Sequence, residues 1–145
     1  MHKILFSLFI VLLVLGCSSG KKQLERGDYY EAVIKSVNRL KNNPDHKKSK
    51  ETLRHAYPLA VESLTEKAEF GISSNSNEKW INAVDQYKKL YTLYNLIKET
   101  PGARYVIPDA KSYFTVLSEA KNNAAEESYT DGVKYLNKNN TLNIS

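Results

Sequence analysis

Apolar residues along most of this chain recur every three or four positions, the spacing that places them on one face of an α-helix. The segment 29–40 shows the pattern most clearly, with Tyr29, Ala32, Val33, Val37 and Leu40 on one side. Alternating runs of β-branched residues, which are typical of strands, are missing apart from Tyr105-Val106-Ile107, which is short and close to Pro108. The pattern therefore predicts an all-α protein.

Four helical segments are expected, at about 28–42, 47–70, 78–98 and 109–138. The breaks between them are Pro44, the polar loop 71–77 and Pro101-Gly102, after which we expect an irregular link. Pro58 falls inside the second segment and is expected to kink or restart the helix, because proline removes a backbone donor. Asn122-Asn123 is a further point at which the last segment can divide into two pieces.

The first residues differ from the rest of the chain. A short positive stretch ends at Lys3, and an apolar run follows from Ile4 to Leu15. This run is much shorter than the roughly 20 residues that a membrane-spanning helix needs, so it is typical of a signal peptide. It ends at Gly16, directly before Cys17, which is the single cysteine of the chain.

Val14-Leu15-Gly16-Cys17 resembles the lipobox of bacterial lipoproteins. The resemblance implies a signal peptide over 1–16, a lipidated Cys17 (palmitate among its acyl chains) and a short tether over 17–23. Ser18 after the cysteine implies the outer membrane, facing the periplasm. An ordinary secretory signal with an incidental cysteine is the alternative.

Within the first helical segment, Gly27-Asp28-Tyr29, Ala32 and Pro44 resemble the second half of a tetratricopeptide repeat (TPR). Parts of the same spacing occur at Leu53 and Tyr57, at Trp80, Ala83, Tyr87 and Leu90, and at Gly132, Tyr135 and Asn139. The resemblance implies antiparallel helical hairpins stacked as a short TPR-like solenoid over 24–138, before a disordered tail over 139–145. An irregular helical bundle is the alternative.

Too few residues precede Gly27 to form a full partner helix for the first repeat, and the last repeat lacks its second helix. Repeat arrays need their end faces covered. We therefore expect either a partner that covers these ends or a chain that is a shortened version of a longer protein, and we slightly favour the second.

Positive charge is concentrated near the predicted tether. Residues 21–54 hold ten basic side chains against five acidic ones, whereas the whole chain has a net charge of +5. The candidate membrane-proximal basic patch consists of Lys21, Lys22, Lys47, Lys48 and Lys50. Lysines near an anionic membrane surface contribute about 1 kcal/mol each. The alternative is a solvated helical face, and nucleic acid is not an expected partner of an exported protein.

Residues with chemical roles are sparse. His46 and His55 are nine positions apart without a third ligand, which does not indicate a metal site. The acidic pairs Glu62/Glu66 and Glu126-Glu127 are typical of solvated helix faces, and no nucleophile elbow, zinc motif or phosphate-binding glycine loop is present. We therefore predict no enzyme activity, no metal and no cofactor.

Four aromatic residues on the third segment are the candidate partner-binding residues: Trp80, Tyr87, Tyr91 and Tyr94. Because TPR consensus positions are themselves aromatic, these side chains can equally fill the core.

The sequence thus predicts an outer-membrane-anchored lipoprotein that acts as a non-catalytic interaction scaffold for an envelope protein. The alternatives are a periplasmic lipoprotein that binds glycans or peptides, and a truncated accessory subunit of an envelope enzyme or secretion assembly.

Overall fold

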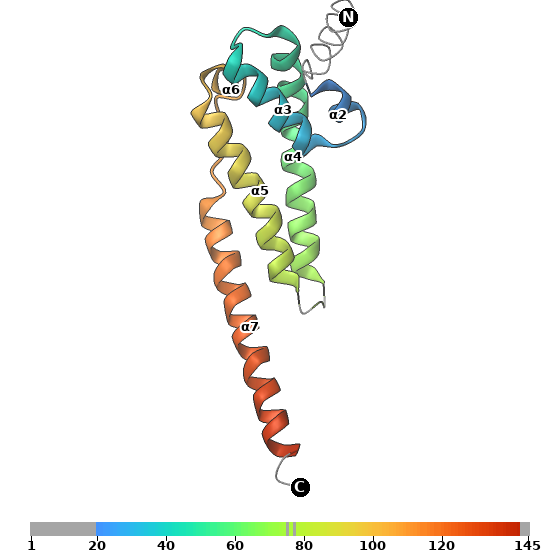
Figure 1. Ribbon diagram of the computed structural model, residues 1–145, viewed down its shortest axis with the longest axis vertical. Helices are drawn as coiled ribbons and strands as arrows, with labels where there is room; N and C mark the ends of the chain where they lie inside the picture. The colour runs from blue at the N-terminus through green and yellow to red at the C-terminus, as the bar shows by residue number, and fades with distance from the viewer. Residues whose placement is uncertain (1–19, 75, 77, 143–145) are drawn as a thin grey trace, which may run out of the picture. The chain divides into compact units, whose positions relative to one another are not determined.

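The computed structural model describes residues 20–74, 76 and 78–142. Helices occupy most of these residues, and the described ranges contain no strand, so the prediction of an all-α protein is confirmed for them. The helices, labelled in Figure 1, are α2 (Lys21–Glu25), α3 (Tyr29–Asn42), α4 (Lys47–Ser73), α5 (Lys79–Glu99), α6 (Pro101–Val106) and α7 (Phe114–Leu142). Cys17 and the predicted leader lie outside the described residues.

The chain divides into two compact units, and α4 and α5 contribute residues to both. Unit 1 comprises the described residues up to Ala60 together with Leu96–Ala110. Unit 2 comprises Val61–Asn95 and the residues from Lys111 onward. The expected helical domain over 24–138 therefore contains parts of both units, and the TPR-like stacking stays a prediction.

Unit 1 is organised around α3, which packs against α2 and α6. The apolar face expected from the sequence is buried, because Ala32, Val33, Val37 and Leu40 are all at most 1% exposed. Gly27 connects α2 to α3 with a φ of +81°, a left-handed conformation that glycine adopts without steric cost. The helix before this turn, α2, has five residues.

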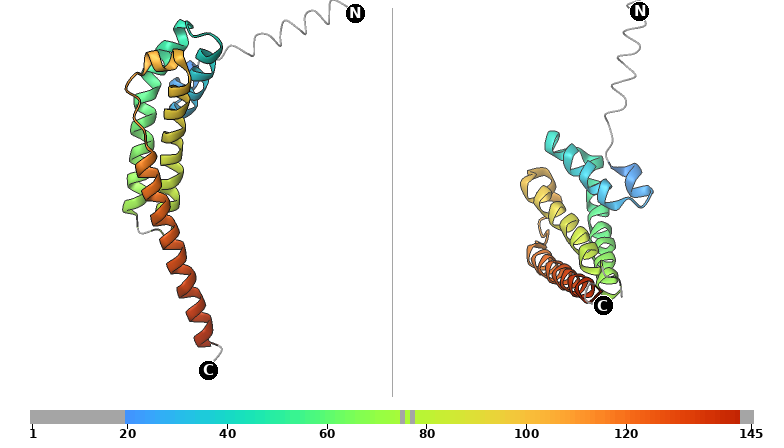
Figure 2. Two further views of the ribbon diagram at one scale, coloured as in Figure 1. Left: turned by 90° about the vertical axis from the view of Figure 1, so that its left-hand side faces the viewer. Right: turned by 60° about the horizontal axis from the view of Figure 1, so that its bottom comes forward.

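Unit 2 consists of the second part of α4, most of α5, and α7. In Figures 1 and 2, α5 runs antiparallel to both α4 and α7. The core of unit 2 consists of buried side chains from all three helices: Leu64, Ala68, Ala83, Leu90, Leu93, Leu117 and Ala120. Because every helix contributes to this set, the three segments stabilise one another by burying apolar surface.

At Pro58 the sequence predicted either a kink or a restart of the helix. Helix α4 is continuous from Lys47 to Ser73, so the restart is wrong, and the kink stays a prediction. Proline leaves the carbonyl of Arg54 without its helical donor, but both residues are exposed, so that water can supply the missing hydrogen bond. The helix also extends into the expected loop 71–77. Its end is stabilised by the hydroxyls of Ser73 and Ser74, which donate to the carbonyls of Phe70 and Gly71 at 3.0 and 2.7 Å.

The irregular link expected after Pro101 contains the short helix α6 instead. Proline occupies the start of this helix, where a backbone N–H has no helical partner and its absence costs nothing. Helix α7 begins at Phe114 rather than near 109 and continues through Asn122-Asn123 without a break to Leu142. Buried Leu117 and Ala120 hold the helix on unit 2, which outweighs the low helix propensity of asparagine.

Candidate binding sites

An aromatic cluster lies where α5 and α7 meet in unit 2. The rings of Tyr91 and Tyr94 stack with centroids 6.3 Å apart and an interplanar angle of 26°. The ring of Phe114 lies 6.0 Å from that of Tyr91 at an angle of 52°. Phe114 is the first residue of α7 and is 61% exposed, whereas Tyr91 and Tyr94 are half-buried. The cluster therefore leaves a large aromatic face open to solvent.

This aromatic face is part of a hollow of about 370 Å³, which we call the aromatic groove. Its lining residues are Lys88, Tyr91, Thr92, Asn95, Phe114, Leu117, Ser118 and Lys121. Tyr91, Phe114 and Leu117 supply apolar surface, while Lys88 and Lys121 are exposed and positively charged. The groove thus combines apolar anchoring surface with two cations, a composition that suits an apolar segment followed by acidic side chains.

Tyr87 takes part in packing within unit 2. Its side chain is half-buried, and this burial raises the pKa of its hydroxyl above 10.0, with smaller contributions from the carboxylates of Glu69 and Glu119. Burial also raises the pKa of Tyr113, although a hydrogen bond with Thr65 acts in the opposite direction. Both phenols therefore stay neutral at physiological pH, and the hydrogen bond with Thr65 joins the residue before α7 to α4.

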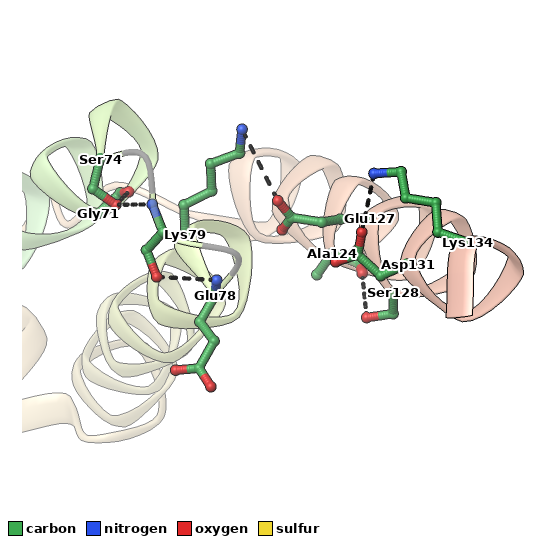
Figure 3. Close-up of polar contacts among 10 residues, drawn as sticks. Gly71, Ser74, Glu78, Lys79, Ala124, Glu127, Ser128, Asp131 and Lys134 are labelled. Carbon is green, nitrogen blue, oxygen red and sulfur yellow. Dashed lines mark hydrogen bonds and ion pairs between the residues drawn. The ribbon is translucent and has the colours of Figure 1, made fainter. Parts of the chain in front are cut away.

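Trp80 lines a separate, polar hollow of about 300 Å³ in unit 2, which we call the tryptophan hollow. Its other lining residues are Lys79, Asn123, Glu126, Glu127, Thr130, Asp131 and Lys134. Figure 3 shows the facing ion pair between Lys79 Nζ and Glu127 Oε1, 4.0 Å apart, and Asp131 Oδ1 accepting from Lys134 Nζ at 3.2 Å. The four aromatic residues singled out from the sequence are therefore not a single site, because only Tyr91 and Tyr94 stack together.

The turn before α5 positions Lys79 at this hollow. The hydroxyl of Ser76 accepts the backbone N–H of Glu78 at 3.1 Å, and the backbone N–H of Lys79 donates to the carbonyl of Ser76 at 3.2 Å. Glu127 Oε1 faces Lys79, but Glu127 Oε2 is buried without a hydrogen-bond partner. The Glu127 side chain is 22% exposed and lines the hollow.

In the structure, the five lysines of the expected basic patch do not form a single group. Lys21 and Lys48 line a hollow of about 460 Å³ in unit 1, the basic hollow, together with His46 and His55. Lys22 and Lys47 are exposed and outside its lining. Lys50 contacts other residues of the unit: its Nζ is 2.9 Å from Asp45 Oδ1 and 5.3 Å from the ring centre of Tyr105. The ion pair lowers the pKa of the Asp45 carboxyl below 3.8.

His46 precedes α4 and interacts with the first turn of that helix. The backbone N–H of Ser49 donates to His46 Nδ1 at 3.2 Å, and the Ser49 hydroxyl lies 2.8 Å from the same nitrogen. A backbone N–H can only donate, so Nδ1 is the acceptor and the proton of the neutral ring lies on Nε2. His46 therefore stabilises the start of α4 through one ring nitrogen and keeps the other as a donor.

No group of three or more metal-binding side chains was found in the part of the chain that the structure describes. Within the same residues, every helix is too short or too polar to cross a membrane.

Comparison with known proteins gives no relative: no family model, curated protein or solved structure matches this chain.

Phe114 was not predicted as a site residue, because its exposure depends on where α7 begins. The placement of His46 and His55 in the lining of one hollow was not predicted either. The helical spacing of residues on α4 would have indicated part of the basic hollow. Lys48, Thr52 and His55 are spaced i, i+4 and i+7 and share one face of α4. The contributions of Lys21 and His46 required the tertiary structure.

Proposed function

We propose that this chain is an outer-membrane-anchored bacterial lipoprotein that acts as a non-catalytic scaffold for a protein partner in the cell envelope. Lipid on Cys17 would hold it at the membrane, facing the periplasm, and the aromatic groove of unit 2 would bind the partner. The observation that carries the binding proposal is the exposed ring of Phe114, which lies 6.0 Å from the ring of Tyr91 in a hollow that Lys88 and Lys121 also line.

Exposed aromatic rings in a hollow are effective interface anchors, because binding removes a large apolar area from water at a low cost in side-chain entropy. Phe114 and Tyr91 supply such an area here. Lys88 and Lys121 add charge complementarity to an acidic partner and would accelerate its association. We therefore propose a partner segment with one or two large apolar side chains next to aspartate or glutamate.

Helix α7 offers further surface for the same partner. Among the described residues, its exposed large apolar side chains are Phe114, Val116, Tyr129, Val133, Tyr135 and Leu136. Of these, Tyr129, Val133 and Leu136 follow one another at i, i+4 and i+7, so they lie along one stripe of the helix. A partner that covers this stripe as well as the groove would bury more apolar area than the groove alone.

Site-specific photo-crosslinking in cells tests the proposal. A photoreactive phenylalanine derivative at position 114 is expected to capture one envelope protein in stoichiometric amount. The same derivative at position 70 is the matched control, because Phe70 is 78% exposed in the same unit but does not line the groove. Equal capture of abundant membrane proteins from both positions would contradict a specific partner.

The lipid anchor has its own test. Radiolabelled palmitate is expected to label the chain, and Cys17→Ser should abolish the label. Unchanged labelling of Cys17→Ser, or absence of label in the parent chain, would contradict the lipoprotein proposal without bearing on the aromatic groove.

The tryptophan hollow supports a second candidate function, the binding of a glycan. Sugar rings commonly stack on an indole, while carboxylates and amides form hydrogen bonds with the sugar hydroxyls. In this hollow, Trp80 provides the indole, Asp131 the carboxylate and Asn123 the amide. Trp80 is the single tryptophan of the chain, so its fluorescence reports on this hollow alone. Titration with N-acetylglucosamine oligosaccharides should shift its emission, less so in Asp131→Asn; an unchanged spectrum would contradict this candidate.

A further inference from the structure

The basic hollow of unit 1 gathers two lysines, two histidines and a threonine from three places in the chain. The Thr52 hydroxyl donates to the carbonyl of Lys48 at 2.8 Å, so the lysines and histidines are the side chains that can donate to a ligand. Lys48, Thr52 and His55 come from one face of α4, Lys21 is the first residue of α2, and His46 precedes α4. Its volume of about 460 Å³ is far larger than a single water requires, so a polyatomic ion and part of an attached group can enter. Leu24 supplies apolar surface at its wall.

We infer that this hollow is a binding site for a phosphate group, carried by an anionic phospholipid headgroup or present as free phosphate. Its headgroup form rests on the membrane anchor proposed above, whereas binding of free phosphate does not.

The chemistry of the lining matches an anion. Lys21 and Lys48 are ammonium groups, which bind phosphate as point charges with three donors each. His46 Nδ1 is occupied by the backbone of Ser49, so its free ring nitrogen Nε2 is a donor and not an acceptor. The amino-terminal end of α4, next to His46, adds the positive end of a helix dipole.

Few carboxylates near the hollow would compete with a bound anion. Among the described residues, Glu51 is the one carboxylate that lines the hollow, and it is exposed. Glu25 Oε1 lies 3.7 Å from Lys21 Nζ, but both side chains are more than 60% exposed, and an exposed pair of this kind contributes little. Lys21 can therefore turn from Glu25 to a bound anion at small cost.

Neighbouring residues supply a matched control. Lys22 and Lys47 are each adjacent in sequence to a lining lysine, carry the same charge and are exposed, but neither lines the hollow. Lys21→Gln/Lys48→Gln and Lys22→Gln/Lys47→Gln therefore change the net charge equally. A difference between the two double variants reports on the hollow and not on general electrostatic attraction.

The experiment uses the full chain in non-ionic detergent micelles, which keep it in solution whether or not Cys17 is lipidated. Three probes are titrated at low ionic strength: inorganic phosphate, short-chain phosphatidylglycerol and short-chain phosphatidylcholine. Binding is followed through the amide NMR signals of Thr52 and His55. We expect saturable shifts with phosphate or phosphatidylglycerol, weaker binding of phosphatidylcholine, and a Kd at least tenfold higher in Lys21→Gln/Lys48→Gln. The control double variant should change the Kd less than twofold.

Each outcome decides the inference. Tighter binding of phosphatidylglycerol than of inorganic phosphate supports the headgroup as the source, and the reverse supports free phosphate. Equal weakening by both double variants, or no saturable shift with any probe, overturns the inference. Circular dichroism of each variant verifies that the helices are retained. Loss of palmitate labelling or of a crosslinked partner would contradict the proposed function while leaving the inorganic phosphate result standing.

Discussion

Gly20 packs against α3 so closely that a Cβ atom built on it would lie 2.5 Å from the carbonyl oxygen of Ala32. The same carbonyl accepts a hydrogen bond of 2.7 Å from the hydroxyl of Ser36, which is fully buried. Gly20 also has a φ of +80°. Backbone conformation and close packing thus both require glycine at position 20, the first described residue of unit 1.

Gly20→Ala is therefore expected to lower the free energy of unfolding by about 2–4 kcal/mol, through a strained backbone and a clash with α3. Gly27→Ala is the control, because Gly27 has nearly the same φ, +81°, but no atom within 4 Å of its Cβ position. That variant should lose only about 1 kcal/mol. Chemical denaturation measures both values, and equal losses would contradict the close packing of Gly20.

Substitutions on α5 should separate core from surface aromatics. Leu93 is 0% exposed, so Leu93→Ala should cost about 2–5 kcal/mol. Tyr91→Ala should cost only about 1–2 kcal/mol, because its ring is half-buried and mainly loses contacts with Tyr94 and Phe114. Urea denaturation compares the two variants. A loss at Tyr91 as large as that at Leu93 would place this ring in the core and weaken its assignment to a partner.

The pair of Asp45 and Lys50 should be visible in titration. Because Lys50 lowers the pKa of the folded Asp45 carboxyl below its ordinary value of 3.8, the pair stabilises the folded state above that pH. This contribution is lost as the pH falls through the folded pKa. Carboxyl carbon NMR should show the pKa of Asp45 return toward 3.8 in Lys50→Met; an unchanged value would contradict the ion pair.

The ion pair in the tryptophan hollow makes an asymmetric prediction. Lys79→Met removes the cation that faces Glu127 Oε1 and should lower the free energy of unfolding by at most about 1 kcal/mol, because both side chains are partly exposed. Glu127→Met removes the unsatisfied acceptor and should be neutral or stabilising. Thermal and urea unfolding of the two variants tests this, and an equal loss in both would show that the pair itself stabilises unit 2.

The elements that could be predicted from the sequence are those with a strong local signal. Helix α3 is the best case, because its apolar period identified four side chains that are buried in unit 1. The end of the third helical segment near 98 was also close to the observed end at Glu99, since Pro101 marks it.

The misjudged elements depend on contacts that a local pattern does not contain. Pro58 is tolerated because its side of α4 faces solvent, and Asn122-Asn123 remain helical because Leu117 and Ala120 anchor α7. The candidate sites were predictable in residue type but not in grouping. Tyr91 and Tyr94 are neighbours on α5, but Phe114, which joins them in the aromatic cluster, comes from α7. The lining of the basic hollow likewise combines residues of α2 and α4.

Lys21 is a wall residue of the basic hollow and is four positions from Cys17. Four residues span at most about 14 Å, so lipid on Cys17 would keep the hollow within that reach of the bilayer surface. Confinement of this kind gives the headgroups an effective concentration of the order of millimolar or higher. A site whose intrinsic Kd lies well below this effective concentration would then be mostly occupied at the membrane, and it would lose this advantage on a chain released from the membrane.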